Sequence, residues 1–390
     1  MRDLVPALEQ RRQQHLYRQR QTLDSPQGVE ICVDGEAFVS FCSNDYLGLA
    51  SHPELVSALV EGAQRFGVGS GAAHLITGHS VAHQALEEEL AEFTGQPRAL
   101  LFSTGYMANL GVASALMGRG DTLVEDRLNH ASLIDAAQLS GARLLRYRHN
   151  DMDSLQRRLA AAGQGEKLVA VDAVFSMDGD SAPLAAMQKH CREHAAWLLV
   201  DDAHGFGVLG EQGRGSFVDQ LGQGADNTIL MATLGKALGT FGAFVAGSDA
   251  LVETLIQQAR TYVYTTATPP ALAWATRTAL RLVREGDHLR AHLNDLIRHF
   301  RSGAEQLGLP LMDSATPIQP LLVGEAATAL RLGAALRQQG ILVGVIRPPT
   351  VPEGAARLRI TLSAQHSPEQ VDRLLDALDA CYREVMHAAL

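Results

Sequence analysis

Seven short apolar segments between residues 98 and 247 constrain the fold of this 390-residue chain more than any other feature. Most are short and rich in Val, Leu and Ile, as strands covered on both faces of a sheet should be. They are RALLFS, DTLVED, ARLLRY, KLVAVDAVF, AWLLVDDA, NTILMAT and GAFVAG. Helical patterns of about 10–14 residues lie between several of them, so this region predicts βαβ units and a mainly parallel, seven-stranded sheet.

The flanking regions follow other patterns. Before the apolar segments we expect a polar helix over residues 4–20 and a hairpin, ICVDGEAFVSF, which turns at Asp34-Gly35. Helices at about 53–66 and 80–94 follow, the second ending at Gly95.

After residue 270 the pattern becomes that of a smaller α+β domain. It predicts two long helices over 270–306, strands near 318–323, 341–346 and 357–362, and a closing helix from Pro368. We therefore expect an N-terminal helix and hairpin segment (1–46), a large α/β domain (47–275) and a C-terminal α+β domain (276–390).

Composition excludes several classes of function. With 46% hydrophobic and 19% charged residues the chain is globular, and a net charge of −10 argues against nucleic acid or an anionic membrane as a partner. The four cysteines are far apart without metal-ligand spacing, so we expect reduced thiols and no metal site. Residues 99–118 are uncharged, but Ser103, Thr104, Gly105 and Asn109 interrupt them, which indicates a buried strand, turn and helix. The charged N-terminus lacks an apolar stretch, so we expect a cytoplasmic protein.

The strongest local signal is TLGKALG, which places Lys236 directly after a buried strand. A lysine at such a position is suited to imine chemistry, because desolvation disfavours the ammonium form and frees the amine to attack an aldehyde. An isolated Gly-Lys pair is more often a surface loop. The segment is not a phosphate-binding P-loop, since Ala237 stands where Ser or Thr is required.

A second signal is LLVDDAHGFGVLG, where two acids and a histidine follow another buried strand. Asp201 and Asp202 point to opposite sides of the strand and cannot share a role. Asp201-x-x-His204 alone fits a helix cap or half a metal site as well as it fits catalysis. A carboxylate that keeps a cofactor's ring nitrogen protonated would explain why Asp201 is buried.

Three further segments carry polar residues at predicted strand ends. In FSTGYMAN, Gly105 opens a helix whose free N–H groups suit a phosphate. His130 starts a helix in DRLNHASLID, and Ser176 ends a strand in VFSMDGDSAPL; a lone histidine is more often structural. Gly67-x-Gly69-x-x-Ala72 fits a dinucleotide fingerprint loosely, but it follows a helix rather than a strand, so the NAD interpretation fails.

Taken together, Asp201-x-x-His204, Thr233-x-x-Lys236, His130 in HASL and Ser176 in FSMDGD resemble the α-oxoamine synthases. These are fold-type I enzymes dependent on pyridoxal 5′-phosphate (PLP) that condense an amino acid with an acyl-CoA and release CO₂ and CoA. The resemblance covers nearly the whole chain, from SNDYLGL to IRPPTVP. It departs from the Gly/Ser-rich pattern of many relatives at Ala72, Ala73 and His74, which puts the acyl-binding surface in doubt.

The resemblance implies roles for individual residues. Lys236 would form the Schiff base with PLP, Asp201 would face the ring nitrogen, and His130 would stack on the ring and contact substrate. The other cofactor-binding residues would be Gly105, Tyr106, Ser176, His204, Thr233, and Thr265 and Thr266 of the YTTATPP segment, which would reach the site of a second subunit in a homodimer. Residues that would bind the substrate carboxylate or acyl chain are Arg18, Asn44, Arg347 and Thr350.

Within this family, VFSMDGDSAPL, VDDAHGFGVLGEQGRG and especially IRPPTVP favour the member that joins L-alanine to pimeloyl-CoA, or to pimeloyl-acyl carrier protein, in biotin synthesis. One alternative is a sister synthase that uses glycine and another acyl-CoA. A second is a non-catalytic regulatory subunit with the same fold, but such a protein has no chemical use for both Lys236 and Asp201.

Overall fold

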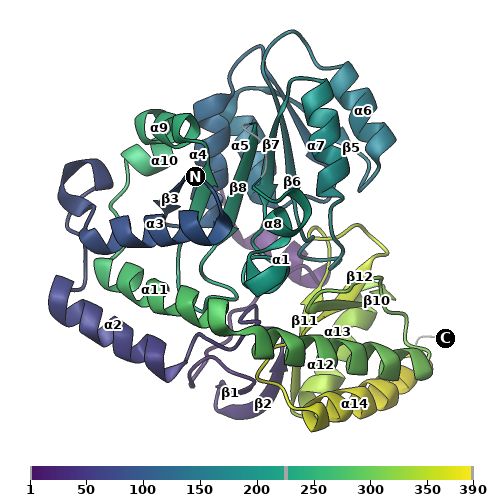
Figure 1. Cartoon of the computed structure of the whole chain (residues 1–390). Helices are drawn as coiled ribbons and strands as arrows, with labels where there is room; N and C mark the ends of the chain where they lie inside the picture. Colours follow the sequence, from purple (N-terminus) through teal and green to yellow (C-terminus); the bar gives the residue numbers. More distant parts are fainter. Residues whose placement is uncertain (1, 224–226, 388–390) are drawn as a thin grey trace. The chain divides into compact units, whose positions relative to one another are not determined.

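The computed structural model describes residues 2–223 and 227–387. By its internal contacts the chain forms two compact units. The large unit comprises residues 49–176 and 181–290, and the small unit comprises residues up to 48, residues 177–180 and those from 291 onward. Figure 1 shows the elements of both units coloured along the sequence.

The large unit is built on a seven-stranded sheet with the strand order β3-β9-β8-β7-β6-β4-β5. β9 is antiparallel to both neighbours, whereas the pairs among β4 to β8 are parallel. The predicted mainly parallel sheet is thereby confirmed. The strands are β3 (Arg98–Phe102), β4 (Thr122–Asp126), β5 (Arg143–Tyr147), β6 (Lys167–Asp172), β7 (Trp197–Asp201), β8 (Thr228–Thr233) and β9 (Ala243–Gly247).

Both faces of this sheet are covered, which explains the continuous apolar character of its strands. Leu168, Leu199 and other strand residues form one core cluster with α4 (Gly105–Leu116), α5 (Ala131–Ser140), α9 (Asp249–Gln258) and α10 (Arg260–Val263). The alternate residues Val169 and Val200 are also fully buried. On their side α7 (Leu184–Glu193) packs against β7, and α6 (Met152–Ala160) and α8 (Ser216–Leu221) contact α7.

The remaining helices of the large unit are α2 (Pro53–Phe66), α3 (Val81–Thr94), α11 (Pro270–Glu285), the π-helical turn η1 (His74–Gly78) and the 3₁₀ turn η2 (Glu211–Gly213). Of these, α2, α3 and α11 lie where the sequence pattern placed helices, whereas the short turns η1 and η2 were not predicted. α3 ends at Gly95 in the left-handed conformation, as predicted. α11 packs against both α2 and α3.

The small unit holds a five-stranded sheet with the order β1-β2-β11-β12-β10. Asp34 and Gly35 both have positive φ and close the predicted hairpin, whose second strand pairs in parallel with β11. The strands are β1 (Glu30–Val33), β2 (Glu36–Phe41), β10 (Ile318–Gly324), β11 (Ile341–Ile346) and β12 (Ala356–Thr361). Its long helices are α12 (Asp287–Gln306), α13 (Ala326–Gln338) and α14 (Pro368–His387). α12 follows α11 after a break at Gly286. The sequence pattern did not predict α13.

Two expectations about element ends were wrong. The N-terminal helix α1 is Val5–Gln13 rather than 4–20; it buries no residue, and the chain turns at His15, whose φ is +58°. Beyond it the guanidinium of Arg347 donates to the carbonyls of His15 and Tyr17, which fixes a non-helical segment. Ser176 does not end a strand, because β6 stops at Asp172 and Val174 forms only an isolated bridge with Ser181.

Within the described residues, no helix is long and apolar enough to cross a membrane. The uncharged stretch 99–118 instead forms β3 and α4, the buried strand, turn and helix that its polar residues predicted.

Candidate active site

The carboxyl ends of five strands in the large unit bring most of the predicted site residues to one edge of the sheet. Ligands of open α/β sheets bind at this edge. The residues surround a pocket of about 210 Å³, lined by Gly105, Tyr106, His130, Ser132, Asp172, Val174, Ser176, Asp201, Ala203, His204, Met231, Thr233 and Lys236. Eight of these thirteen are residues that the sequence singled out.

Lys236 stands in the turn that joins β8 to β9. Its Nζ lies 2.9 Å from Nε2 of the buried His204, so only one of the two nitrogens donates the hydrogen bond between them. The turn requires glycine at position 239, where φ is +66° and a Cβ would collide with the backbone of Leu49 and Ala50. The TLGKALG sequence thus holds a partly buried amine against the pocket.

Asp201 ends β7 and has both carboxylate oxygens engaged. Oδ1 accepts the backbone N–H of Ala203 at 3.1 Å, and Oδ2 accepts a side-chain N–H of Asn109 at 2.8 Å. Asp202 points the other way and accepts the backbone N–H of Phe217 at 3.0 Å, which confirms that the two acids face opposite sides. Burial raises the pKa of Asp202 to about 7.

His130 caps α5 and lines the pocket beside Asp172. Its backbone N–H donates to Oδ2 of Asp172 at 2.8 Å. Burial, followed by the charge of Asp201, holds the pKa of Asp172 well above its ordinary value. The pocket therefore contains two buried acidic side chains, Asp172 and Asp201, each of which accepts a hydrogen bond from a neighbouring residue.

The sequence reasoning missed Asp172, Asn109 and Ser132. Asp172 ends the apolar segment KLVAVD just as Asp201 ends WLLVD, so the same strand-end pattern would have found it. Asn109 and Ser132 lie inside helices and carry no sequence signal of their own.

A phosphate-sized group has donors at the start of α4. Thr104 caps this helix by accepting the backbone N–H of Met107 at 3.1 Å. The N–H groups of Gly105 and Tyr106 have no partner within the helix because they belong to its first turn. Together with the helix dipole they suit a dianion at this side of the pocket.

The remaining predicted residues lie elsewhere. Thr265 and Thr266 are outside the pocket, in a segment where Thr266 forms a bridge with Ala73. The predicted substrate residues belong to the small unit, where Arg18 donates to the hydroxyl of Thr350 at 3.3 Å. There Asn44 accepts a hydrogen bond from Arg359 at 3.1 Å. Burial, and then the charge of Arg18, lower the pKa of Arg347.

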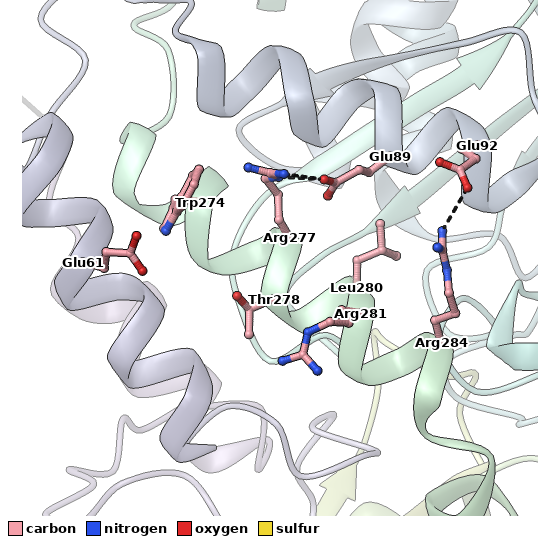
Figure 2. Close-up of a pocket in the computed structure, with 9 residues that line it drawn as sticks. All are labelled: Glu61, Glu89, Glu92, Trp274, Arg277, Thr278, Leu280, Arg281 and Arg284. Atoms are coloured by element: carbon pink, nitrogen blue, oxygen red, sulfur yellow. Dashed lines mark hydrogen bonds and ion pairs between the residues drawn. The ribbon is translucent and has the colours of Figure 1, made fainter.

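A larger hollow of about 470 Å³ lies elsewhere in the large unit, between α2, α3 and α11. Figure 2 shows two ion pairs across it, Arg277 with Glu89 and Arg284 with Glu92. These guanidinium and carboxylate groups neutralise one another, and the lining has no amine, thiol or imidazole. We therefore place the reactive chemistry at the smaller pocket.

Comparison with known proteins defines the class of protein to which this fold and pocket belong. Residues 36–378 match the family model of aminotransferase class I and II, and the chain belongs to this family. The match covers most of the chain, including every residue of the pocket.

Individual relatives are more specific. The chain is 62% identical to the 8-amino-7-oxononanoate synthase of Thioalkalivibrio sulfidiphilus over 98% of both chains. Relatives of the same name from Pseudomonas strains are 58–60% identical. Among solved structures, the serine palmitoyltransferase of Sphingomonas wittichii superimposes with a TM-score of 0.93 at 33% identity, over 98% of both chains. A serine palmitoyltransferase variant from S. paucimobilis, with a bound PLP–myriocin aldimine, has a TM-score of 0.92 at 29% identity, over 98% of this chain and 97% of that one.

The protein is a PLP-dependent acyltransferase, and the pocket fits PLP. Its lining includes the amine of Lys236 and the buried side chain of Asp201, which is suited to a protonated ring nitrogen. The first N–H groups of α4, at Gly105 and Tyr106, are suited to the phosphate. Hydrogen bonds to both oxygens of Asp201 hold this side chain in a fixed orientation at the pocket.

Proposed function

We propose that this protein condenses L-alanine with pimeloyl-CoA to give 8-amino-7-oxononanoate, CO₂ and CoA. The observation that carries the proposal is the 62% identity to an 8-amino-7-oxononanoate synthase over nearly the whole chain, compared with 33% to the serine palmitoyltransferase of Sphingomonas wittichii. The pocket supports it with a lysine amine, a buried carboxylate and phosphate donors at one strand edge.

Bound PLP supplies an electron sink for negative charge that develops at the substrate α-carbon. We propose that Lys236 would hold PLP covalently and that Asp201 would face its ring nitrogen. His204 and Ser176 would bond the ring hydroxyl. The phosphate would be held by Gly105, Tyr106 and Thr233. These residues line one pocket, which is what the assignment requires.

The other steps are assigned to side chains of this protein. The Nζ of Lys236 takes the α-proton of L-alanine, with His204 2.9 Å away to exchange a proton with it. The α-carbon then bonds to the thioester carbonyl carbon, and CoA leaves as a thiolate that takes a proton from solvent. The alanine carboxylate departs as CO₂, and the electron pair left on the α-carbon takes back the proton held on Nζ of Lys236. Arg347 is our candidate for the carboxylate anchor, because a guanidinium offers two parallel N–H donors and Arg18 adds a second cation close by.

A matrix of amino acids against acyl-CoA thioesters, scored by CoA release, tests the substrates. We expect the highest kcat/KM for L-alanine with pimeloyl-CoA, and much lower values for glycine with succinyl-CoA or acetyl-CoA. A single methyl group discriminates only about tenfold to two-hundredfold, so slow turnover of glycine with pimeloyl-CoA is compatible with the proposal. The substrate assignment is refuted if L-serine with palmitoyl-CoA, or glycine with succinyl-CoA or acetyl-CoA, gives a higher kcat/KM than L-alanine with pimeloyl-CoA. The assignment of the chain to its family would be unaffected by that result. The same assay with pimeloyl-acyl carrier protein in place of pimeloyl-CoA tests which acyl carrier the enzyme prefers.

We also propose that the protein is a homodimer in which the segment at Thr265 and Thr266 completes the partner's site. The large unit exposes apolar side chains on two segments that pair with each other at Ala73 and Thr266. Val68 is 87% exposed, Ile76 76% and Tyr264 73%, which is unfavourable unless another surface covers them. A second copy covers the same patch on both subunits by symmetry.

Subunit complementation tests this arrangement. Neither the Lys236→Ala dimer nor the Thr265→Ala/Thr266→Ala dimer should be active, whereas a mixed dimer contains one intact site. Random mixing should therefore restore about a quarter of the wild-type activity. Verified mixed dimers that show no recovery would mean that each site is built from one chain.

A further inference from the structure

A chain of hydrogen bonds in the large unit connects Asp201 to His130. The side-chain nitrogen of Asn109 donates to Oδ2 of Asp201 at 2.8 Å and to the hydroxyl of Ser132 at 2.9 Å. That hydroxyl lies 2.8 Å from Nδ1 of His130. Asn109 is 0% exposed and Ser132 is 1% exposed, so bulk water does not compete for these bonds.

The chemistry of Asn109 sets the direction of every bond in this chain. Its amide must turn the N–H side toward Asp201, because the opposite orientation would place the amide oxygen against the carboxylate. Oδ1 of Asn109 has no hydrogen-bond partner among the described residues, and the contact with Asp201 holds the amide in this orientation nonetheless. The second N–H then donates to Ser132, whose own hydroxyl proton is left to donate onward.

The onward acceptor is Nδ1 of His130. The backbone N–H of Ser132 also points to Nδ1, at 3.3 Å. Two donors directed at one ring nitrogen leave no place for a proton on it, so the neutral imidazole carries its proton on Nε2. Since Asp172 holds the backbone N–H of the same residue, both the ring and the main chain of His130 are anchored at the pocket wall.

We propose that Asn109 and Ser132 are positioning residues that keep Asp201 an acceptor and His130 the Nε2–H tautomer. His130 thereby presents a hydrogen-bond donor to an oxygen atom of the molecule in the pocket. The inference rests on the proposed function only in that Asp201 and His130 contact cofactor and substrate there.

The tautomer is measured on the cofactor-free protein by ¹⁵N NMR with labelled histidine. The chain has 15 histidines, so the signals of His130 are identified by their loss in His130→Gln. In the wild type, Nδ1 should resonate as an unprotonated ring nitrogen and Nε2 as a protonated one. Ser132→Ala should move both signals toward an average of the two tautomers. The matched control is Ser140→Ala, on the same helix, whose hydroxyl donates to the carbonyl of Ala137 and accepts the backbone N–H of Ala142.

The kinetic arm separates positioning from substrate binding. Ser132→Ala should lower kcat about tenfold to a hundredfold while KM for pimeloyl-CoA stays within about twofold, as loss of an outer partner of a reactive group does. Ser132→Thr retains the hydroxyl and should restore the wild-type tautomer. Asn109→Leu removes both bonds and should lower kcat further than Ser132→Ala.

The inference is overturned if the wild type carries its proton on Nδ1, or if Ser132→Ala leaves both tautomer and kcat unchanged. The first measurement needs no substrate, so it is independent of which reaction the enzyme performs. If the tautomer shifts as expected while alanine and pimeloyl-CoA are not turned over, the inference stands and the proposed function fails.

Discussion

Lys236→Ala should abolish the covalent attachment of PLP and lower condensation activity at least about a thousandfold, with the fold unchanged. The amine lies in the pocket 2.9 Å from His204, and no other lysine lines that pocket. The sequence contains only three lysines, Lys167, Lys189 and Lys236, so borohydride reduction followed by peptide mapping has three candidate sites. We expect the label on Lys236 alone, together with loss of the visible absorbance band in the variant.

The other two lysines supply matched controls. Lys189 is exposed on α7, and Lys167 begins β6 at the opposite end of the strand from the site. Lys167→Ala and Lys189→Ala should keep both the absorbance band and the activity. If the Lys236→Ala protein retained a borohydride-reducible label, the assignment would be wrong; circular dichroism and Tm verify that it is folded.

Asp201→Asn should retain PLP but slow the exchange of the α-proton of L-alanine at least about a hundredfold. A neutral amide no longer stabilises a proton on the ring nitrogen, and removal of such a preorganised group costs about 3 kcal/mol of barrier or more. The amide also has one acceptor oxygen for the two donors of Ala203 and Asn109, so one of those bonds is lost. Proton NMR in D₂O measures the exchange directly and requires no acyl substrate.

Asp202→Asn is the control for this variant. Asp202 is fully buried and faces away from Asp201, so its substitution should change thermal stability and leave the exchange rate within about threefold. Near-normal exchange in Asp201→Asn would remove the proposed role from that residue. Slow exchange in Asp202→Asn alone would transfer the role to its neighbour.

Local chemistry was sufficient to predict much of the fold. The seven apolar segments became the seven strands of the large sheet, because strands buried on both faces must be apolar throughout. Asp34-Gly35 and Gly95 predicted a turn and a helix end correctly, since both need a positive φ that few other residues adopt. The pattern failed for the helix at 4–20, where a polar segment without a buried face carries no register that could mark its end.

In the candidate site, too, some residues could be predicted from the sequence and others could not. Lys236 and Asp201 could be predicted, because a polar residue directly after an apolar strand must reach the carboxyl edge of a parallel sheet. The partners of these residues could not. Asn109 is 92 positions from Asp201 and 23 from Ser132, and nothing in its own segment distinguishes it from a helix residue that faces the core.

What the sequence alone determined was therefore which strands form and which chemical groups stand at their ends. The tertiary structure decided which of those groups meet: that Asn109 donates to Asp201, that His204 lies against Lys236, and that burial, followed by the charge of Asp201, raises the pKa of Asp172. The physical reason is that hydrogen-bond direction and pKa depend on distances of about 3 Å between segments far apart in the chain. Those distances exist only after the sheet and its helices have packed.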